Sequence, residues 1–344
     1  MIKTKKIWID IINPSNVHYF RSLTPDLSDC EIFVTVRDRA ETVKLAKSFW
    51  TDGKVVGRDY TGSFKKPANM IIRTLDLAVK APKFDVAMSF ENGMSVSISK
   101  IRGKQSILYC DNDLKFDQKK NAVQDLETKI KSLATHIIIP NVCYENFKKV
   151  TDGDKLIQFN GYKEDIYIAD YNPDQEFLNR LPFDEFVVVR PEALASFYVK
   201  ETNSITPELI RLLLDNNINV IYLPREKEDI KYANGVNVFI PKEPLNGLDL
   251  CYYANAIVTG SGTFAREAAC MGTTSVSFFP SDILLSVDQK LVEEGKIFHS
   301  KNSEEIADHI ISNYKNKKEL NLERSKKVKK DVVKITNEIL YKIR

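Results

Sequence analysis

The chain has 344 residues, of which 43% are hydrophobic and 28% are charged, and its formal net charge is +3. This length favours two domains over one, and the composition is that of an ordinary globular protein. So small a net charge gives no reason to expect a nucleic-acid partner. No window approaches the roughly 20 apolar residues that cross a bilayer, so we expect any membrane contact to be peripheral.

Cysteine usage indicates a reducing compartment. The cysteines are odd in number, scattered, and lack any C-x-x-C spacing: Cys30, Cys110, Cys143, Cys251 and Cys270. We expect reduced thiols in a cytoplasmic protein, with any membrane association at the inner face.

Short apolar runs alternate with helical patterns along the whole chain. Strand-like runs cover residues 6–12, 31–36, 85–90, 106–110, 136–140 and 155–159, and then 186–190, 219–223, 236–240, 256–259 and 274–279. Helical patterns lie between them, for example at 41–49, 122–133, 207–214 and 283–294. This alternation predicts parallel sheets with helices on both faces.

Turn-forming and acidic residues gather at 161–185, as expected of a linker. The sequence therefore predicts an α/β protein with an N-terminal domain at 1–165 and a C-terminal domain at 166–325. Ligands of doubly wound sheets bind at the carboxyl ends of the strands. We expect the two domains to face each other across a cleft lined by residues that follow strands.

The last segment, 326–344, is predicted to be a helix that packs its apolar stripe on a domain. The stripe follows helical spacing and consists of Val328, Val332, Ile335, Ile339 and Ile343. Residues 315–344 hold eleven basic and four acidic side chains. A helix lying on a membrane surface is the alternative, which Asp331 and Glu338 weaken.

Polar loops follow three strands of the first half. The candidate cleft and catalytic residues in these loops are Asn13, Ser15, Asn16, His18, Glu91, Asp111 and Asp113. A histidine suits proton transfer near neutral pH, and carboxylates can hold hydroxyl groups or act as bases. The alternatives are a structural role for His18 and helix capping by Asp111 or Asp113.

Arginines follow two strands of the second half. Arg190 ends an apolar strand, and Arg225 stands in the same place after the next one. A guanidinium fork matches phosphate oxygens, although a buried ion pair is a competing interpretation for Arg190.

A glycine-rich turn at 259–263 joins a predicted strand to a predicted helix. Gly260 and Gly262 let the backbone approach an anion, Ser261 and Thr263 add hydroxyl donors, and Glu267 lies one turn further on. A phosphate site beside a carboxylate that can accept from a sugar hydroxyl predicts a nucleotide-sugar site. Packing alone is the competing explanation of such a turn.

Other chemistries find no support in the sequence. The histidines are far apart, with no H-x-x-x-H, and the chain has no G-x-S-x-G. We therefore expect no metal and no cofactor besides the substrate.

Three segments together resemble the DUF354 family, which is similar to GT-B glycosyltransferases. They are Trp8-Ile-Asp-Ile with Asn13-Pro and Val17-His18-Tyr-Phe20, then Val187-Val-Val-Arg190-Pro, then Thr259-Gly-Ser-Gly-Thr with Arg266-Glu267-Ala-Ala and Gly272. The wider superfamily includes MurG-type transferases and UDP-N-acetylglucosamine 2-epimerases. Asn16 departs from the His-x-His of many first loops, and Ser261 is closer to the epimerases than to Gly-Gly-Thr.

The resemblance implies a GT-B fold with two Rossmann-like domains. It matches Ser261, Gly262 and Thr263 to the phosphate loop, Glu267 to the ribose-binding glutamate and His18 to the first-loop histidine. We expect a transferase that moves a sugar from a nucleotide diphosphate, with UDP expected, to a glycan or lipid-linked acceptor in cell-envelope synthesis. Epimerisation through Glu91 and Asp111, and nucleotide-sugar binding without catalysis, stay open, as does the oligomeric state.

Overall fold

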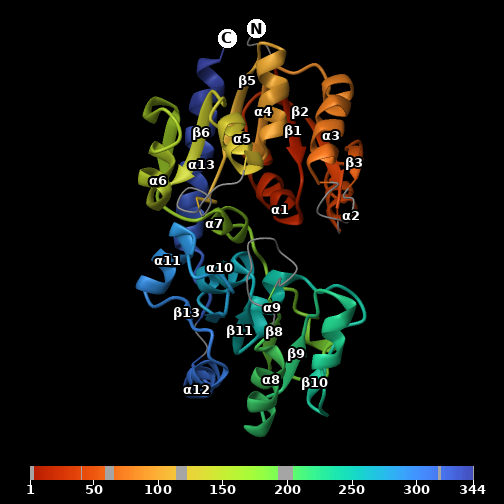
Figure 1. The fold of residues 1–344 in the computed structure, drawn as a ribbon, viewed down its shortest axis with the longest axis vertical. Coiled ribbons are helices and arrows are strands. Elements are labelled where there is room, and N and C mark those ends of the chain that lie inside the picture. The colour runs from red at the N-terminus through yellow and green to blue at the C-terminus, as the bar shows by residue number, and fades with distance from the viewer. Residues whose placement is uncertain are drawn as a thin grey trace. The chain divides into compact units, whose positions relative to one another are not determined.

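The computed structural model describes residues 4–39, 41–58, 66–113, 122–192, 204–316 and 319–343, without the side chains of 66–70, 122 and 123. The chain forms two compact units. One comprises residues 1–167 with 327–344, and the other comprises residues 168–326. Each unit is built on its own sheet (Figure 1).

All pairings in the first unit's seven-stranded sheet are parallel, and the strand order is β3-β2-β1-β4-β5-β6-β7. The strands are β1 (Lys5–Ile11), β2 (Cys30–Asp38), β3 (Lys54–Arg58), β4 (Val86–Phe90), β5 (Gln105–Tyr109), β6 (His136–Pro140) and β7 (Leu156–Phe159). The helices are α1 (Pro14–Leu23), α2 (Thr42–Lys47), α3 (Lys66–Lys80), α4 (Gly93–Ile101), α5 (Ala122–Lys131), α6 (Tyr144–Lys148) and α7 (Lys163–Ile168).

The second unit's six-stranded sheet is also parallel, in the order β10-β9-β8-β11-β12-β13. Its strands are β8 (Val187–Arg190), β9 (Val220–Tyr222), β10 (Val238–Phe239), β11 (Ala256–Thr259), β12 (Thr274–Ser277) and β13 (Phe298–His299). Its helices are α8 (Thr206–Asp215), α9 (Gly247–Tyr253), α10 (Gly262–Met271), α11 (Ser286–Glu293) and α12 (Ser303–Asn313).

The central strands are buried on both faces, as their runs of β-branched residues predict. Every residue of β4 and of β11 is buried. Two strands, β3 and β13, lie where the sequence predicts none. β3 begins with Lys54, ends with Arg58 and contains Gly57 at a positive φ of 79°. β13 has only two residues. Neither strand therefore carries a continuous apolar signal.

The last helix, α13 (Glu323–Lys342), packs on the first unit from Lys327 onward. In Figure 1 this blue helix runs alongside that unit, although it comes from the end of the chain. The Tyr109 hydroxyl lies 2.8 Å from that of Thr336, and both side chains are buried. Val328, Val332 and Ile339 of the predicted stripe are buried as well. No helix among the described residues is both long and apolar enough to cross a membrane.

Candidate functional site

The strand orders define one ligand-binding edge in each unit. In both sheets the chain starts at a central strand, moves outward on one side, and then crosses to the other side of the starting strand. The crossing lies between β1 and β4 in the first unit and between β8 and β11 in the second. Open parallel sheets bind ligands at the carboxyl ends of such a strand pair.

At the β8–β11 edge, sheet register places Arg190 beside the glycine-rich turn. Arg190 is paired with Thr259, and the Gly260 amide donates to the Arg190 carbonyl at 3.0 Å. The Ser261 amide donates to the Thr259 hydroxyl at 3.0 Å, which fixes the turn. The backbone of an arginine thus lies beside the turn that leads into a helix start, and an arginine and a helix start each attract an anion.

The exposed side of α10 carries the predicted hydroxyl and carboxylate. Ser261 is the residue before the helix, and its side chain makes no capping hydrogen bond. Thr263 and Glu267 are half-buried, and their spacing of four residues puts them on one face. The opposite face packs into the unit through Phe264, Ala265, Ala268 and Ala269. Thr263 in the first turn of α10 and Glu267 therefore lie on the same, partly exposed side of the helix.

Gly260 is required by the chain itself. A Cβ atom there would lie 2.5 Å from the Cα of Glu192. Glu192 is fixed in turn, because its carboxylate accepts from the Ser204 and Thr206 hydroxyls at 2.6 and 3.0 Å and from the Ile205 amide at 3.0 Å. From the sequence, we expected Gly260 to let the backbone approach an anion. The close approach that the structure shows at Gly260 is one between two loops of the protein.

Gly262 makes room for a buried ion pair. A Cβ atom there would lie 3.2 Å from both Arg266 Nη1 and Asp288 Oδ2. These two side chains meet at 2.7 Å and join α10 to α11. Both glycines of the turn therefore have a packing role, whatever the turn binds.

Arg225 ties the loop after β9 to the loop after β8. Its Nε atom donates to the Pro191 carbonyl at 2.7 Å, and its amide donates to the Asp229 carboxylate at 3.0 Å. Part of its guanidinium is thus committed to the backbone, which makes Arg225 a support for the Arg190 loop.

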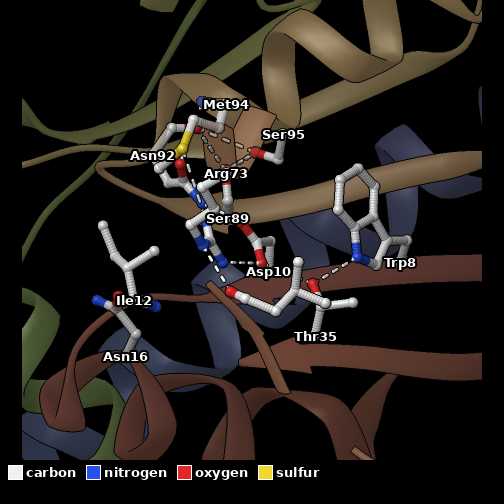
Figure 2. A network of polar contacts seen from close by, with 11 residues as sticks. Trp8, Asp10, Ile12, Asn16, Thr35, Arg73, Ser89, Asn92, Met94 and Ser95 are labelled. Atoms are coloured by element: carbon white, nitrogen blue, oxygen red, sulfur yellow. Dashed lines mark hydrogen bonds and ion pairs between the residues drawn. The ribbon is translucent and has the colours of Figure 1, made fainter. Parts of the chain in front are cut away.

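At the β1–β4 edge, a buried polar network surrounds Asp10 (Figure 2). The Asp10 carboxylate is fully buried and forms two hydrogen bonds with the Arg73 guanidinium, at 2.7 and 2.9 Å. The Thr35 hydroxyl and the Asn92 amide donate to it at 2.6 Å each. The Thr35 hydroxyl accepts in turn from the Trp8 indole at 2.8 Å. Four donors thus satisfy one buried carboxylate, as burial of a charge requires.

This network was not predicted from the sequence. Asp10 interrupts an apolar strand, and a buried carboxylate requires a partner, so a signal for some partner was present. Arg73 lies 63 residues away in a helix, and nothing in the sequence identifies it. Arg73 also donates to the Val56 carbonyl at 2.9 Å, and the Asn92 side chain caps α4 by accepting from the Met94 amide at 3.1 Å.

Glu91 lies at the turn after β4 with a positive φ of 53°. One carboxylate oxygen accepts from the Asp111 and Asn112 amides at 3.0 and 2.9 Å, and the other contacts Lys131 Nζ at 2.5 Å. Lys131 also contacts Glu127 at 2.9 Å. Burial alone would lower the pKa of Lys131, but the two carboxylates outweigh it and raise that pKa. Glu91 thus joins the two acidic loops of the prediction.

Asp111 and Asp113 are both buried. Asp111 pairs with Lys163 at 2.7 Å, and Lys163 also contacts Glu164 at 3.0 Å. The Asp113 carboxylate accepts from the side-chain amide of Asn146 at 2.9 Å. Both carboxylates therefore stabilise the β5 edge, and the residues that follow Asp113 lie outside the described part of the chain.

His18 is half-buried in α1, and its ring lies 5.7 Å from that of Tyr167. Burial lowers its pKa, the Arg21 charge lowers it further, and Glu41 opposes the shift. The imidazole is therefore neutral at pH 7, the form that can accept a proton.

The other first-loop candidates order the loop. Asn13 accepts from the Arg39 guanidinium at 2.7 Å, and buried Asn16 accepts from the Ile12 amide at 3.4 Å. Ser15 is half-buried in the first turn of α1. In the described ranges, no three or more His, Cys, Asp and Glu side chains are grouped so that they could hold a metal ion.

The packing role of Gly260 gives a first test. We expect Gly260→Ala to lower the free energy of unfolding by about 1–3 kcal/mol, because the Glu192 backbone must move. Gly153→Ala is the control, because a Cβ atom there would meet only the Tyr144 hydroxyl, at 3.6 Å. Urea denaturation of both variants measures the difference. Equal stabilities would show that the two loops are not in contact.

The lowered pKa of His18 gives a second test. In the unfolded chain its pKa is about 6.5, so below that pH the unfolded state binds more protons. We expect the stability contribution of neutral His18 to be present above pH 6.5 and to be lost as the pH falls below it. NMR titration of the imidazole should give a pKa below 6.5. His18→Gln should make stability less dependent on pH between 7 and 5, and a pKa of 6.5 or above would contradict this account.

The family model described as "Protein of unknown function (DUF354)" matches residues 5–343. An uncharacterized protein of Methanocaldococcus jannaschii is 28% identical over 326 residues, which cover 89% of this chain and 91% of that protein.

Solved structures show the same fold. UDP-GlcNAc 2-epimerase of M. jannaschii, in complex with UDP-GlcNAc and UDP, aligns with a TM-score of 0.69 at 14% identity over 96% of this chain and 99% of that one. S. aureus MnaA with UDP aligns with a TM-score of 0.73 at 13% identity over 98% and 97%. The glycosyltransferase of kitacinnamycin aligns with a TM-score of 0.61 at 10% identity over all of both chains.

These likenesses confirm the predicted fold class of two Rossmann-like parallel-sheet domains. Identities this low show the fold alone. The family match, in contrast, covers nearly the whole chain. The protein belongs to the DUF354 family and has the GT-B fold.

Proposed function

We propose that this protein is a glycosyltransferase that uses a nucleotide-diphosphate sugar, with UDP as the nucleotide. One observation carries the proposal, namely the β8–β11 edge. There Arg190 stands beside the start of a ten-residue helix that presents Thr263 and Glu267 on its exposed side. Two structural neighbours were solved with UDP bound, which supports this choice of ligand.

In the proposed reaction the diphosphate leaves with a growing negative charge. Arg190, the hydroxyls of Ser261 and Thr263, and the free amides at the start of α10 would stabilise that charge. Fixed donors of this kind, aimed at the charge of the transition state, commonly supply the largest part of catalysis. Glu267 would accept hydrogen bonds from the ribose. The turn needs no reorganisation for this, because Gly260 and the Arg266–Asp288 pair already fix it.

The acceptor hydroxyl needs a base, and His18 is the better candidate. Its lowered pKa keeps it neutral at pH 7. Asp111 is paired with Lys163, so accepting a proton would cost it a buried ion pair. We propose a glycan or lipid-linked acceptor, bound by the first unit, and a cytoplasmic enzyme of cell-envelope synthesis that needs no metal.

Glu267 provides the direct test of the nucleotide site. We expect Glu267→Gln to weaken UDP binding by about tenfold to a hundredfold, because hydrogen bonds to a charged acceptor are lost. Isothermal titration calorimetry with UDP measures this effect. Glu293→Gln is the control, since that carboxylate is exposed on another helix of the same unit. UDP affinity that is equal in both variants would remove Glu267 from the site.

The second candidate function is 2-epimerisation of a UDP-sugar. Several structural neighbours favour it, since they are UDP-GlcNAc 2-epimerases. Against it, the two carboxylates that would act as acid and base are both held, Glu91 by two amides and Lys131, and Asp111 by Lys163. Both oxygens of Glu91 are already engaged, so proton transfer to a substrate would require that existing contacts break.

NMR of the protein with UDP-GlcNAc and no acceptor separates these functions. We expect the sugar nucleotide to bind, with perturbed uridine signals. It should stay intact, because a transferase cannot transfer the sugar when no acceptor is present. Appearance of the 2-epimer would establish the epimerase instead. Tight binding without turnover in the presence of a full acceptor panel would indicate a binding protein without catalysis.

A further inference from the structure

The first unit contains a cavity of about 420 Å³ at its β1–β4 edge. This volume lies within the usual range of small-molecule sites. Its walls come from the loop after β1, from the helices α3 and α5, and from the start of α4. The apolar lining consists of Ile12, Ile71, Leu75, Met94, Leu126 and Ile130. The cavity thus occupies the edge where parallel sheets bind ligands, but its chemistry is unlike that of the phosphate-type site in the second unit.

The Asp10 network fixes these walls. Arg73 lies in α3 between the lining residues Ile71 and Leu75, and its ion pair with Asp10 attaches that helix to β1. Asn92 donates to the same carboxylate and caps α4, where Met94 lines the cavity. Two walls are therefore joined through one buried carboxylate, so the cavity is formed before any ligand binds.

The carboxylates of the lining are neutralised. Glu91 and Glu127 both contact Lys131, at 2.5 and 2.9 Å. The two glutamates, Arg37 of the lining and Lys131 together carry no net charge. A cavity with balanced charges and mostly apolar walls complements an uncharged hydrocarbon group. Ser97 of α4 adds a hydroxyl group to the lining.

The mouth of the cavity has apolar side chains that face water. Ile71 is 64% exposed, Leu75 is 63% exposed and Leu126 is 58% exposed. Apolar side chains that gather around a concave site mark binding surfaces, because covering them removes apolar area from water. A flat membrane surface cannot enter a concave site, whereas a single flexible chain can.

We propose that this cavity binds the hydrocarbon chain of an amphiphilic acceptor and leaves the acceptor's hydroxyl-bearing head at the carboxyl edge of the sheet. This inference rests on the proposed transferase function and names its acceptor class, a sugar or alcohol head carried on a lipid chain. The sheet edge then orients the acceptor hydroxyl, while the apolar walls supply affinity that does not depend on the sugar.

A series of n-alkyl β-D-glucosides tests the proposal, from methyl to octyl, each below its micelle-forming concentration. Calorimetric titration of the full chain measures the affinities. We expect affinity to rise by about fourfold for each added methylene until the cavity is full, as burial of a methylene group requires. Affinity that does not depend on chain length would overturn the proposal.

Neighbouring residues of α3 give a matched pair of variants. Ile71→Gln should weaken octyl glucoside binding by about tenfold or more, and Leu75→Gln should do the same. Ile72→Gln should not, because Ile72 is 57% exposed on the same helix but does not line the cavity. All three side chains are largely exposed, so we expect the variants to fold. An equal loss in Ile72→Gln would assign binding to the outer helix face and overturn the proposal.

Two further measurements separate the other outcomes. Binding to phosphatidylcholine vesicles that exceeds binding to monomeric octyl glucoside would indicate a membrane-docking face and would overturn the cavity assignment. UDP is titrated into the same samples. UDP binding without alkyl glucoside binding leaves the transferase proposal standing and overturns this one. Alkyl glucoside binding without UDP binding rejects the proposed function and leaves a hydrocarbon site.

Discussion

A single buried carboxylate organises the ligand-binding edge of the first unit. Asp10 is fully buried and accepts from four donors on three different segments, two of them from the Arg73 guanidinium. Removing one partner from such a pair typically costs about 3–5 kcal/mol, because a charge is left buried and unpaired. This penalty applies to any arrangement in which α3 or α4 leaves β1. The walls of the apolar cavity are therefore held by an electrostatic constraint rather than by contacts among the apolar side chains that line it.

In the second unit, backbone contacts and a second buried ion pair fix the corresponding edge of the sheet. Gly260 lets the turn after β11 touch the Glu192 backbone, and the Arg266–Asp288 pair fixes α10 against α11. The same strand-order crossing thus carries two different chemistries in the two units. One edge has an arginine beside the start of a helix, a combination that suits an anion. The other offers apolar walls with balanced charges.

The sequence predicted what depends on short-range patterns. Continuous apolar runs located the central strands, and the polar residues after them located Arg190, Ser261 and Glu267 at one edge. The pattern failed where burial depends on distant partners. In α3 the apolar residues Ile71, Leu75 and Val79 are exposed, whereas Arg73 is buried on the same face as Leu77. Composition could not reveal this, because the partner that makes burial of Arg73 favourable lies in β1. The missed strand β3 has the same cause, since the Arg73 side chain, which donates to Val56, lies against Gly57.

The contacts of Glu91 and Asp111 in the first unit bear on the choice between the two proposed reactions. An epimerase of the proposed kind needs carboxylates that gain and lose protons in each turnover. Here Glu91 accepts from two amides and Lys131, and Asp111 is paired with a lysine that is itself buried. Both oxygens of Glu91 are engaged, and the partner of Asp111 is a buried lysine, so a substrate that reached either carboxylate would have to break an existing contact. The proposed transferase reaction needs one base and no proton exchange by these carboxylates, and the neutral, half-buried His18 is the base that we propose. The contacts through which these carboxylates hold the loops are thus the ones that a substrate would have to displace, and this supports the proposal of transfer over epimerisation.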